Sequence, residues 1–551
     1  MKIEELQASL PLSQNDRASS SRGEHSCIAR MLICAFGGAL VLIFVWRWNY
    51  NLFGDFYDYS IFASSGNYLH HGLKPYRDFT TSLQSLPIYL CYGAECVFGP
   101  RYLSLAYANL LVGLTFYAAT ILLLKKRLPF LLCVLCAMAM CVATFFQHGI
   151  LWYNSIAMMF LALIVWQSAN IAQENHVSAA RVTILCLLLF LSSMTKANFH
   201  LLGVFMAFVG LAWSFAHADS TERKRFSLVL PLILLCAFVL GPLCETAANG
   251  TTFGDYVQQV FRTPKGRIRD ILPQLVSPGL YFNKLHDFYP DNYSAGIYVT
   301  GAAIFALCAF IALRGEKTRL LYSIQIFLAG QFVASLLVTA SNHDIQILTA
   351  SYLIVGLVAI YLMFNHSMSA AQDRGFKTAI ALLSAIFLIT GSASTFKHSR
   401  LRFLESEKDN SHGTAIVDPQ LTGYLQGVRF TKTAADRFVR ITSFMQKHNL
   451  TGAIEKVYWG PGLELMNRVY DTCPMGHLPL WYHLNTSVND SDSPRIIEAL
   501  EKNHYEWVLG TMYYMKEFPP GVRKYLHDHF DLAEQDAMDD GLIILHRKNN
   551  F

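Results

Sequence analysis

Long apolar runs separated by short polar turns fill most of the first 395 residues of the chain. A run of about 20 apolar residues suits a helix that crosses a hydrocarbon core of about 30 Å. The pattern therefore predicts a polytopic α-helical membrane protein of about eleven transmembrane helices. The expected spans lie near 31–48, 102–124, 129–146, 150–168, 181–195, 198–216, 227–244, 293–313, 319–340, 344–364 and 378–395.

Composition supports the same class. The chain is 53% hydrophobic and only 15% charged, with a mean hydropathy of +0.31, which is too apolar for an ordinary soluble protein. The net charge of +5 is small and gives no reason to expect nucleic acid as a partner. The 12 cysteines show neither the spacing of a metal site nor that of a disulfide framework, and seven of them lie inside apolar runs.

The basic residues orient the predicted helices. The polar tail 1–30 carries Arg22 and Arg30 ahead of the first span, which favours a cytoplasmic N-terminus. Alternation from that start puts the C-terminus outside the cytoplasm, provided that 85–98 is an amphipathic helix at the membrane interface rather than a span. The basic turns then all fall inside: Lys125-Lys126-Arg127, Arg181, Arg223-Lys224-Arg225, Arg314 with Lys317 and Arg319, and Arg374 with Lys377.

The first of two large outer loops, 49–101, is acidic and aromatic. Asp55 and Asp58 come directly after the first span, where a carboxylate is costly unless it has a function. Such a group can act as a general base towards an incoming hydroxyl, or it can bind a divalent cation such as Mg²⁺ or Mn²⁺. Asp55 and Asp58 are therefore candidates for catalysis and for metal binding. The alternative for Asp55 is that it only solvates the loop, and His70-His71 are either metal ligands or polar surface.

The second large outer loop, 245–291, is basic. It carries Arg262, Lys265, Arg267 and Arg269, and Lys196 lies in the short outer turn after the fifth span. Arginine offers bidentate donors and lysine a compact charge, so these cations suit a phosphate. Two alternatives stay open: the loop is simply solvated or touches lipid headgroups, and Lys196 extends its ammonium to the interface.

After the last span, residues 396–551 become charged and alternate helical and strand-like segments. This change predicts an extracytoplasmic α/β domain of ordinary size. Gly460-Pro461-Gly462 lacks the third glycine of a nucleotide-binding loop, so we expect the domain to pack on the outer loops and shape an acceptor site. The expected helices are 436–448 and 494–502, and the expected strands are 453–459, 507–512 and 542–546.

Several of these motifs resemble one family. Gly54-Asp55-x-x-Asp58-Tyr59, then Gly72-Leu73-Lys74-Pro75-Tyr76-Arg77-Asp78-Phe79 and Pro87-Ile88-Tyr89-Leu90, look like the first loop of the C-type glycosyltransferase superfamily. They are most similar to its branch of protein mannosyltransferase-like and lipid A aminoarabinose transferase-like enzymes. The likeness extends to Lys196, to Asn342-His343-Asp344 and to Val457-Tyr458-Trp459-Gly460.

The resemblance implies interfacial helices in the first outer loop. It also implies a glycosyl-transfer reaction. Such enzymes move a sugar from a polyprenyl-phosphate carrier to a glycan, lipid or protein acceptor outside the cytoplasm. By position, Asp55 would activate or orient the acceptor, assisted by Asp58, while Lys196 and the basic loop would hold the lipid phosphate. The candidates for contacting the sugar or the rest of the substrate are Tyr76, Arg77, Asp78 and His343.

Two departures limit what the resemblance implies. The aminoarabinose transferases place a Glu-Lys pair before the proline of the second interfacial helix, whereas this chain has Gln84-Ser85-Leu86 before Pro87. A second outer carboxylate of the kind many relatives carry has only Glu245 and Asp255 as candidates. The resemblance therefore assigns neither a metal nor a lipid A acceptor to this chain.

The sequence thus predicts a membrane glycosyltransferase that works on the extracytoplasmic face in cell-envelope glycan assembly. A bacterial inner membrane, with the site facing the periplasm, is favoured, and an organelle membrane with the site facing its lumen stays open. A transporter or flippase of lipid-linked saccharides is the alternative. It should show ionisable residues in mid-span or broken helices in two related halves, and neither is clear in the sequence. A membrane anchor for the C-terminal domain fits poorly, because anchoring needs only one span.

Overall fold

The computed structural model describes most of the chain outside one long central segment. The described residues are 28–43, 52–53, 58–125, 130–145, 150–173, 178–216, 220–264, 423–430, 432–474, 476–535 and 541–548. The last four predicted spans lie outside these residues, and so do Asp55, Lys265, Arg267, Arg269 and His343.

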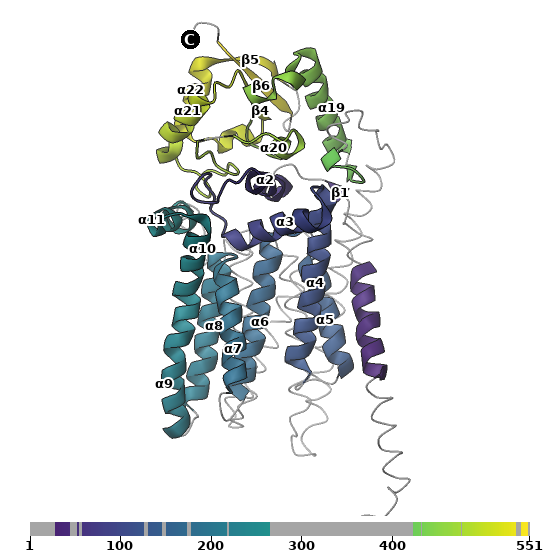
Figure 1. Cartoon of the computed structure of the whole chain (residues 1–551), viewed down its shortest axis with the longest axis vertical. Coiled ribbons are helices and arrows are strands. Elements are labelled where there is room, and N and C mark those ends of the chain that lie inside the picture. Colours follow the sequence, from purple (N-terminus) through teal and green to yellow (C-terminus); the bar gives the residue numbers. More distant parts are fainter. Residues whose placement is uncertain are drawn as a thin grey trace, which may run out of the picture.

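A bundle of apolar helices follows the predicted runs closely (Figure 1). It consists of a helix over Ile28–Ile43, α4 (Tyr102–Leu124), α5 (Phe130–Phe145), α6 (Tyr153–Gln173), α7 (Ala179–Ser193), α8 (Ala197–Ala216) and α9 (Ser220–Leu234). Four helical stretches in the described part are long and apolar enough to cross a membrane, namely Tyr102–Leu124, Tyr153–Ile171, Ala197–Ala216 and Arg223–Asn249. The chain is a helical membrane protein.

The last of these stretches is one continuous helical rod with an irregular middle. Behind α9, which contains Pro231, come a π-helical segment over Leu235–Leu240 and then α10 (Gly241–Asn249). Proline removes a backbone donor from the helical ladder, and a local π-turn is one of the adjustments that satisfy the freed backbone groups in membrane helices. The rod continues past Glu245 to Asn249, five residues beyond the end predicted for this span at residue 244.

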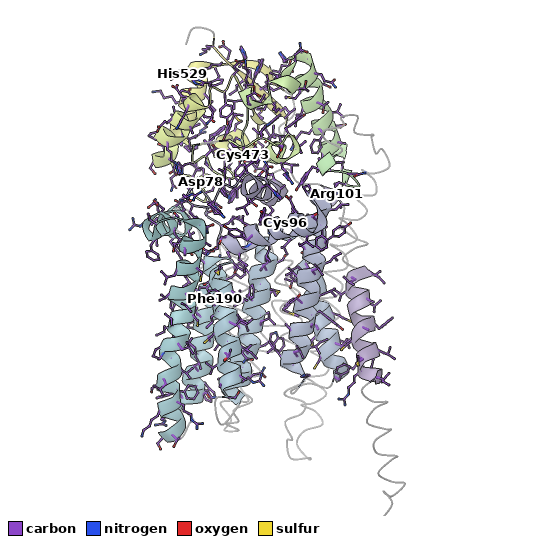
Figure 2. The ribbon with its side chains drawn as sticks, in the orientation of Figure 1. Asp78, Cys96, Arg101, Phe190, Cys473 and His529 are labelled. Atoms are coloured by element: carbon purple, nitrogen blue, oxygen red, sulfur yellow. The ribbon has the colours of Figure 1, made fainter. Side chains whose placement is uncertain are left out.

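A crosswise layer covers one end of the bundle (Figure 1). It contains α2 (Asp58–His70) and α3 (Ser85–Phe98), together with α11 (Phe253–Val257) and a π-helical turn over Gln258–Arg262. The helix predicted over 85–98 is confirmed, with Pro87 in its first turn as expected. Figure 2 places Asp78, Cys96 and Arg101 in the same layer, beneath the C-terminal domain.

The C-terminal domain is built on a four-stranded mixed sheet in the order β3-β4-β6-β5. Its strands are β3 (Val457–Trp459), β4 (Trp507–Thr511), β5 (Phe530–Gln535) and β6 (Leu542–Arg547). Only β3 and β4 run parallel, with Val457 opposite Trp507. The helices are α19 (Lys432–Lys447), α20 (Leu465–Val469), α21 (Ser493–Lys502) and α22 (Pro520–His529).

The elements expected in this domain are present, but helices α20 and α22 and strand β5 were not predicted, and one strand is shorter than expected. The strand predicted over 453–459 covers only 457–459, because Ile454–Lys456 form a turn of 3₁₀-helix. Strand β5 was not predicted, since most of its residues are exposed and polar, with no alternation of the kind that marks a half-buried strand. It is held by antiparallel pairing with β6.

Two backbone pairings join the C-terminal domain to the first outer loop. Strand β1 (Leu52–Phe53) pairs in parallel with β2 (Arg429–Phe430) just ahead of α19. In the second pairing, the Thr80 N–H donates to the Leu478 carbonyl at 3.2 Å, and the Leu480 N–H donates to the Thr80 carbonyl at 2.8 Å. The packing of the domain on this loop, expected from the sequence, is confirmed.

Gly241 allows the rod to approach α7 closely. A Cβ atom at this position would lie 1.8 Å from Ser193 Oγ and 2.9 Å from Ser193 Cβ. We expect Gly241→Ala to lower the free energy of unfolding by roughly 1–3 kcal/mol, as overpacking does. Thermal unfolding of the purified full-length protein measures the change.

Gly93 in α3 provides the matched control, because a Cβ there would meet nothing within 4 Å. Alanine has the higher helix propensity, so Gly93→Ala should be neutral or slightly stabilising. Equal melting temperatures for the two variants would contradict the close crossing of the rod and α7.

Candidate active site

Lys196 lies in the turn between α7 and α8, at the end of the bundle that carries the crosswise layer. Its Nζ atom donates a 2.6 Å hydrogen bond to Asn154 Oδ1. The same atom lies 4.7 Å from the centre of the Tyr153 ring and 5.3 Å from that of Phe199. The Asn154 carboxamide and two aromatic faces thus contact the Lys196 ammonium.

The start of α2 lies beside this lysine. The Phe62 ring makes an edge contact with Trp152 at a centroid distance of 5.4 Å and lies 6.1 Å from Tyr153, the ring that faces Lys196. Helix α2 begins at Asp58, about one turn before Phe62. The structure therefore brings the beginning of the acidic loop and Lys196 to one place. For Asp58 it describes the backbone only, and the predicted roles of Asp55 and Asp58 stay predictions.

Arg77 and Asp78 form an ion pair with each other at the rim of the layer. Arg77 donates two hydrogen bonds to the Asp78 carboxylate, at 2.9 and 2.7 Å, and the Lys74 N–H donates a third at 2.8 Å. The hydrogen bonds from Arg77 are the main reason why the pKa of Asp78 lies below its usual value. In this arrangement both side chains stabilise the turn, and their predicted contact with substrate stays a prediction.

Tyr76 is buried, and its predicted contact with substrate stays a prediction. Its hydroxyl lies 2.8 Å from the Leu83 carbonyl and 3.3 Å from Glu245 Oε2. Its backbone has a φ of 65°, which is uncommon for a residue other than glycine, and Gln259 Nε2 holds the Tyr76 carbonyl at 2.9 Å. Burial raises the pKa of Tyr76 well above its usual range, so the hydroxyl stays protonated. The residue ties the first outer loop to the segment after α10.

The two candidates for a second acidic residue, Glu245 in the rod and Asp255 in α11, differ in burial. Glu245 is fully buried, and its Oε1 accepts hydrogen bonds from the Ser85 N–H at 2.7 Å and from Ser85 Oγ at 3.0 Å. It thus caps the first turn of α3. Asp255 is exposed and accepts a 2.6 Å hydrogen bond from Thr252. Arg262 is also exposed, at the end of the π-helical turn, where it is open to either a phosphate or a lipid headgroup.

A buried polar cluster joins this layer to the C-terminal domain. This cluster was not predicted from the sequence. Glu95 of α3 is paired with Arg468 of α20 at 2.9 Å, and the two side chains are 0% and 8% exposed. The Tyr424 hydroxyl donates to Glu95 Oε1 at 3.1 Å, and His70 Nε2 lies 3.1 Å from Glu95 Oε2. One signal was available: Glu95 is the single charged residue of the otherwise apolar segment 85–98.

The two adjacent histidines, considered above as metal ligands, each contact a carboxylate within hydrogen-bond distance. His70 contacts Glu95, and His71 Nε2 lies 3.1 Å from Asp471 Oδ1. Across the described ranges, His, Cys, Asp and Glu form no group of three or more with the geometry to hold a metal ion. Because Asp55 lies outside those ranges, a divalent cation at Asp55 and Asp58 stays a prediction.

The comparisons with known proteins show a distant likeness in fold. No protein-family model matches the chain, and no curated protein matches it in sequence. Among solved structures, ArnT from Cupriavidus metallidurans bound to undecaprenyl phosphate aligns over 96% of this chain and 98% of its own, with 9% identity and a TM-score of 0.48. The Archaeoglobus fulgidus oligosaccharyltransferase tethered to an acceptor peptide aligns over 94% of this chain and 74% of its own, with 12% identity and a TM-score of 0.43. At these values the likeness assigns no activity to this chain.

The Glu95 cluster should make stability depend on pH. Burial raises the pKa of Glu95 to about 7, against the opposing effects of Arg468 and Tyr424. A carboxyl with a raised pKa binds its proton more tightly in the folded protein than in the unfolded chain. Its contribution to stability is thus greatest below the unfolded pKa of about 4.3 and is lost as the pH rises through 7.

Glu95→Gln removes this titration while keeping the side chain's size. We expect the melting temperature of the wild type, relative to that of Glu95→Gln, to fall between about pH 4 and pH 7 and to level off above that. The exposed Glu498 of α21, replaced by glutamine, is the control and should follow the wild type. If wild type and Glu95→Gln have parallel stability profiles, Glu95 does not titrate in this range.

Proposed function

We propose that the chain is a membrane glycosyltransferase that moves a sugar from a polyprenyl-phosphate carrier to an extracytoplasmic glycan, lipid or protein acceptor. The observation that carries the proposal is the position of Lys196, held by Asn154 and Tyr153 beside the start of the acidic first outer loop. A cation next to a carboxylate-bearing loop at the outer end of the helices is what this reaction needs. The motif resemblance of that loop supports the same activity.

The proposed chemistry is an in-line displacement at the anomeric carbon of the donor. The acceptor hydroxyl oxygen forms the new bond to that carbon while the bond from the carbon to the carrier phosphate oxygen breaks. Asp55 takes the hydroxyl proton as general base. Lys196, with Arg262 and its basic neighbours, stabilises the negative charge that develops on the leaving polyprenyl phosphate.

The distribution of basic residues supports the orientation of this site. Lys125 follows the end of α4, Arg181 lies in the first turn of α7, and Arg223 to Arg225 lie near the start of α9. These helix ends are all at the end of the bundle away from the C-terminal domain (Figure 1). Basic residues favour the cytoplasmic side, so Lys196 and the C-terminal domain would face the periplasm of a bacterial inner membrane.

A flippase or transporter of lipid-linked saccharides is the second candidate function. The observation that favours it is the interrupted rod: the segment Leu235–Leu240 is π-helical, and the buried His200 Nε2 lies 2.9 Å from the Ala237 carbonyl. Transporters use broken helices and buried ionisable groups at their binding sites. Such a protein would move the donor across the membrane without breaking its sugar–phosphate bond.

The direct test incubates purified full-length protein with polyprenyl-phosphate sugars and a membrane acceptor extract. Mass spectrometry then follows the donor and the released polyprenyl phosphate. We expect the wild type to consume one donor, and Asp55→Asn, which keeps the size but removes the base, to slow turnover by roughly 10²–10⁴-fold. Chelation of divalent cations in the same assay tests the predicted Mg²⁺ or Mn²⁺.

Glu498→Gln is the matched control, because it removes one carboxylate from an exposed helical face of the C-terminal domain. It should turn over donor at the wild-type rate. Near-normal turnover by Asp55→Asn would contradict the role of Asp55. Transfer of intact donor across a vesicle membrane, with no release of polyprenyl phosphate, would favour the transporter.

A further inference from the structure

Glu245 holds the start of α3 from the end of the α9–α10 rod. Its side chain is fully buried, and a buried carboxylate is costly unless hydrogen bonds compensate for its loss of water. Two donors come from Ser85 in the first outer loop, the Ser85 N–H at 2.7 Å and Ser85 Oγ at 3.0 Å. The Tyr76 hydroxyl of the same loop lies 3.3 Å away, and Tyr256 of α11 also hydrogen-bonds the carboxylate. One carboxylate thus fixes two parts of that loop.

The next residue of α3 is bonded to the turn that carries Lys196. The Leu86 N–H donates a 3.0 Å hydrogen bond to the Met194 carbonyl, two residues before Lys196. The N–H groups of Ser85 and Leu86, which follow each other in α3, are therefore bonded to Glu245 and to the turn that carries Lys196, respectively. The first N–H groups of a helix have no intrahelical acceptor. Both contacts therefore supply acceptors that α3 lacks.

The rod that carries Glu245 also touches the other side of the same turn. At Gly241 its backbone lies so close to Ser193 that no Cβ would fit between them. Ser193 is the last residue of α7 and directly precedes Met194. The Lys196 turn is thus enclosed by two contacts of one rod, directly through Gly241 and indirectly through Glu245 and α3.

We propose that Glu245 is a positioning residue that sets the place of the Lys196 ammonium through the first turn of α3. The inference rests on the proposed function, in which Lys196 binds the carrier phosphate. Glu245 itself touches neither donor nor acceptor. Without its carboxylate, the start of α3 loses its fixed partner, and the Lys196 turn loses the support of Leu86.

The test compares the affinities of the full-length protein for undecaprenyl phosphate and for undecaprenol, which lacks the phosphate. We expect Glu245→Ala to reduce the preference for the phosphate by roughly tenfold, which is the effect of losing buried hydrogen bonds of this kind. Glu245→Gln keeps one carbonyl oxygen for the Ser85 N–H and should reduce it by only about threefold. Glu498→Gln should retain the wild-type preference.

The ratio of affinities separates positioning from general destabilisation. A variant that only loses stability should bind the two lipids with the same proportional loss, whereas a displaced Lys196 affects the phosphate alone. In a Lys196→Gln background, Glu245→Ala should cause no further loss of preference, because its effect acts through that lysine. The less disruptive Glu245→Gln provides the same comparison if the alanine variant does not fold.

Two results would overturn the inference, and they differ in whether the proposed function survives. If the wild type prefers the phosphate and both Glu245 variants keep that preference, Glu245 does not position Lys196, and the proposed function is unaffected. If the wild type binds both lipids equally, there is no phosphate site for Glu245 to position. The proposed function would then fail as well.

Discussion

The buried ion pair between Glu95 and Arg468 is the contact on which the layer above the membrane helices depends. Arg468 also donates to Asn67 Oδ1 at 3.2 Å, and its guanidinium lies 4.9 Å from the centre of the Tyr424 ring. The first outer loop with His70, the segment with Tyr424 and helix α20 with Arg468 therefore all contact the Glu95 carboxylate. Above the Glu95 pKa of about 7, loss of Arg468 would leave a buried carboxylate uncompensated, which typically costs about 3–5 kcal/mol.

This pair requires close packing of the two crosswise helices. A Cβ at Gly66 of α2 would lie 3.1 Å from the Glu95 carboxylate, so α2 passes directly over the charge. Asn67, the next residue, donates to the Asn467 carbonyl at 3.0 Å and to the Thr472 carbonyl at 2.8 Å. Helix α2 is thus fixed between α3 and the C-terminal domain. Its start, which begins the acidic segment, lies next to the aromatic residues around Lys196.

The sequence predicted much of the fold, because long apolar runs and basic turns mark membrane helices directly. It predicted α3 as an interfacial helix and Lys196 in an outer turn. It did not predict that the rod continues through Glu245, because a carboxylate near an apolar run reads as the start of a loop. Only the structure shows that Ser85 and Tyr76, distant in sequence, supply the donors that make this buried carboxylate stable.

The candidate site was predicted only in part, because contacts between residues far apart in the sequence leave no local pattern. Residue type and position suggested Lys196, but its partners Asn154 and Tyr153 belong to another helix and carry no sequence signal of binding. Tyr76 looked like a substrate contact because it lies in a conspicuous motif, and its burial depends on Leu83, Gln259 and Glu245. The pairing of Glu95 with Arg468 spans 373 positions, which no local pattern encodes.

The C-terminal domain thus holds the crosswise layer in place through Arg468. Amide hydrogen exchange of the full-length protein and of its Arg468→Met variant, which keeps a long apolar side chain, tests this role. We expect faster exchange across α2, α3 and α20 in the variant, with α4 and α8 unchanged. Unchanged protection of α2 and α3 in a folded Arg468→Met protein would contradict it.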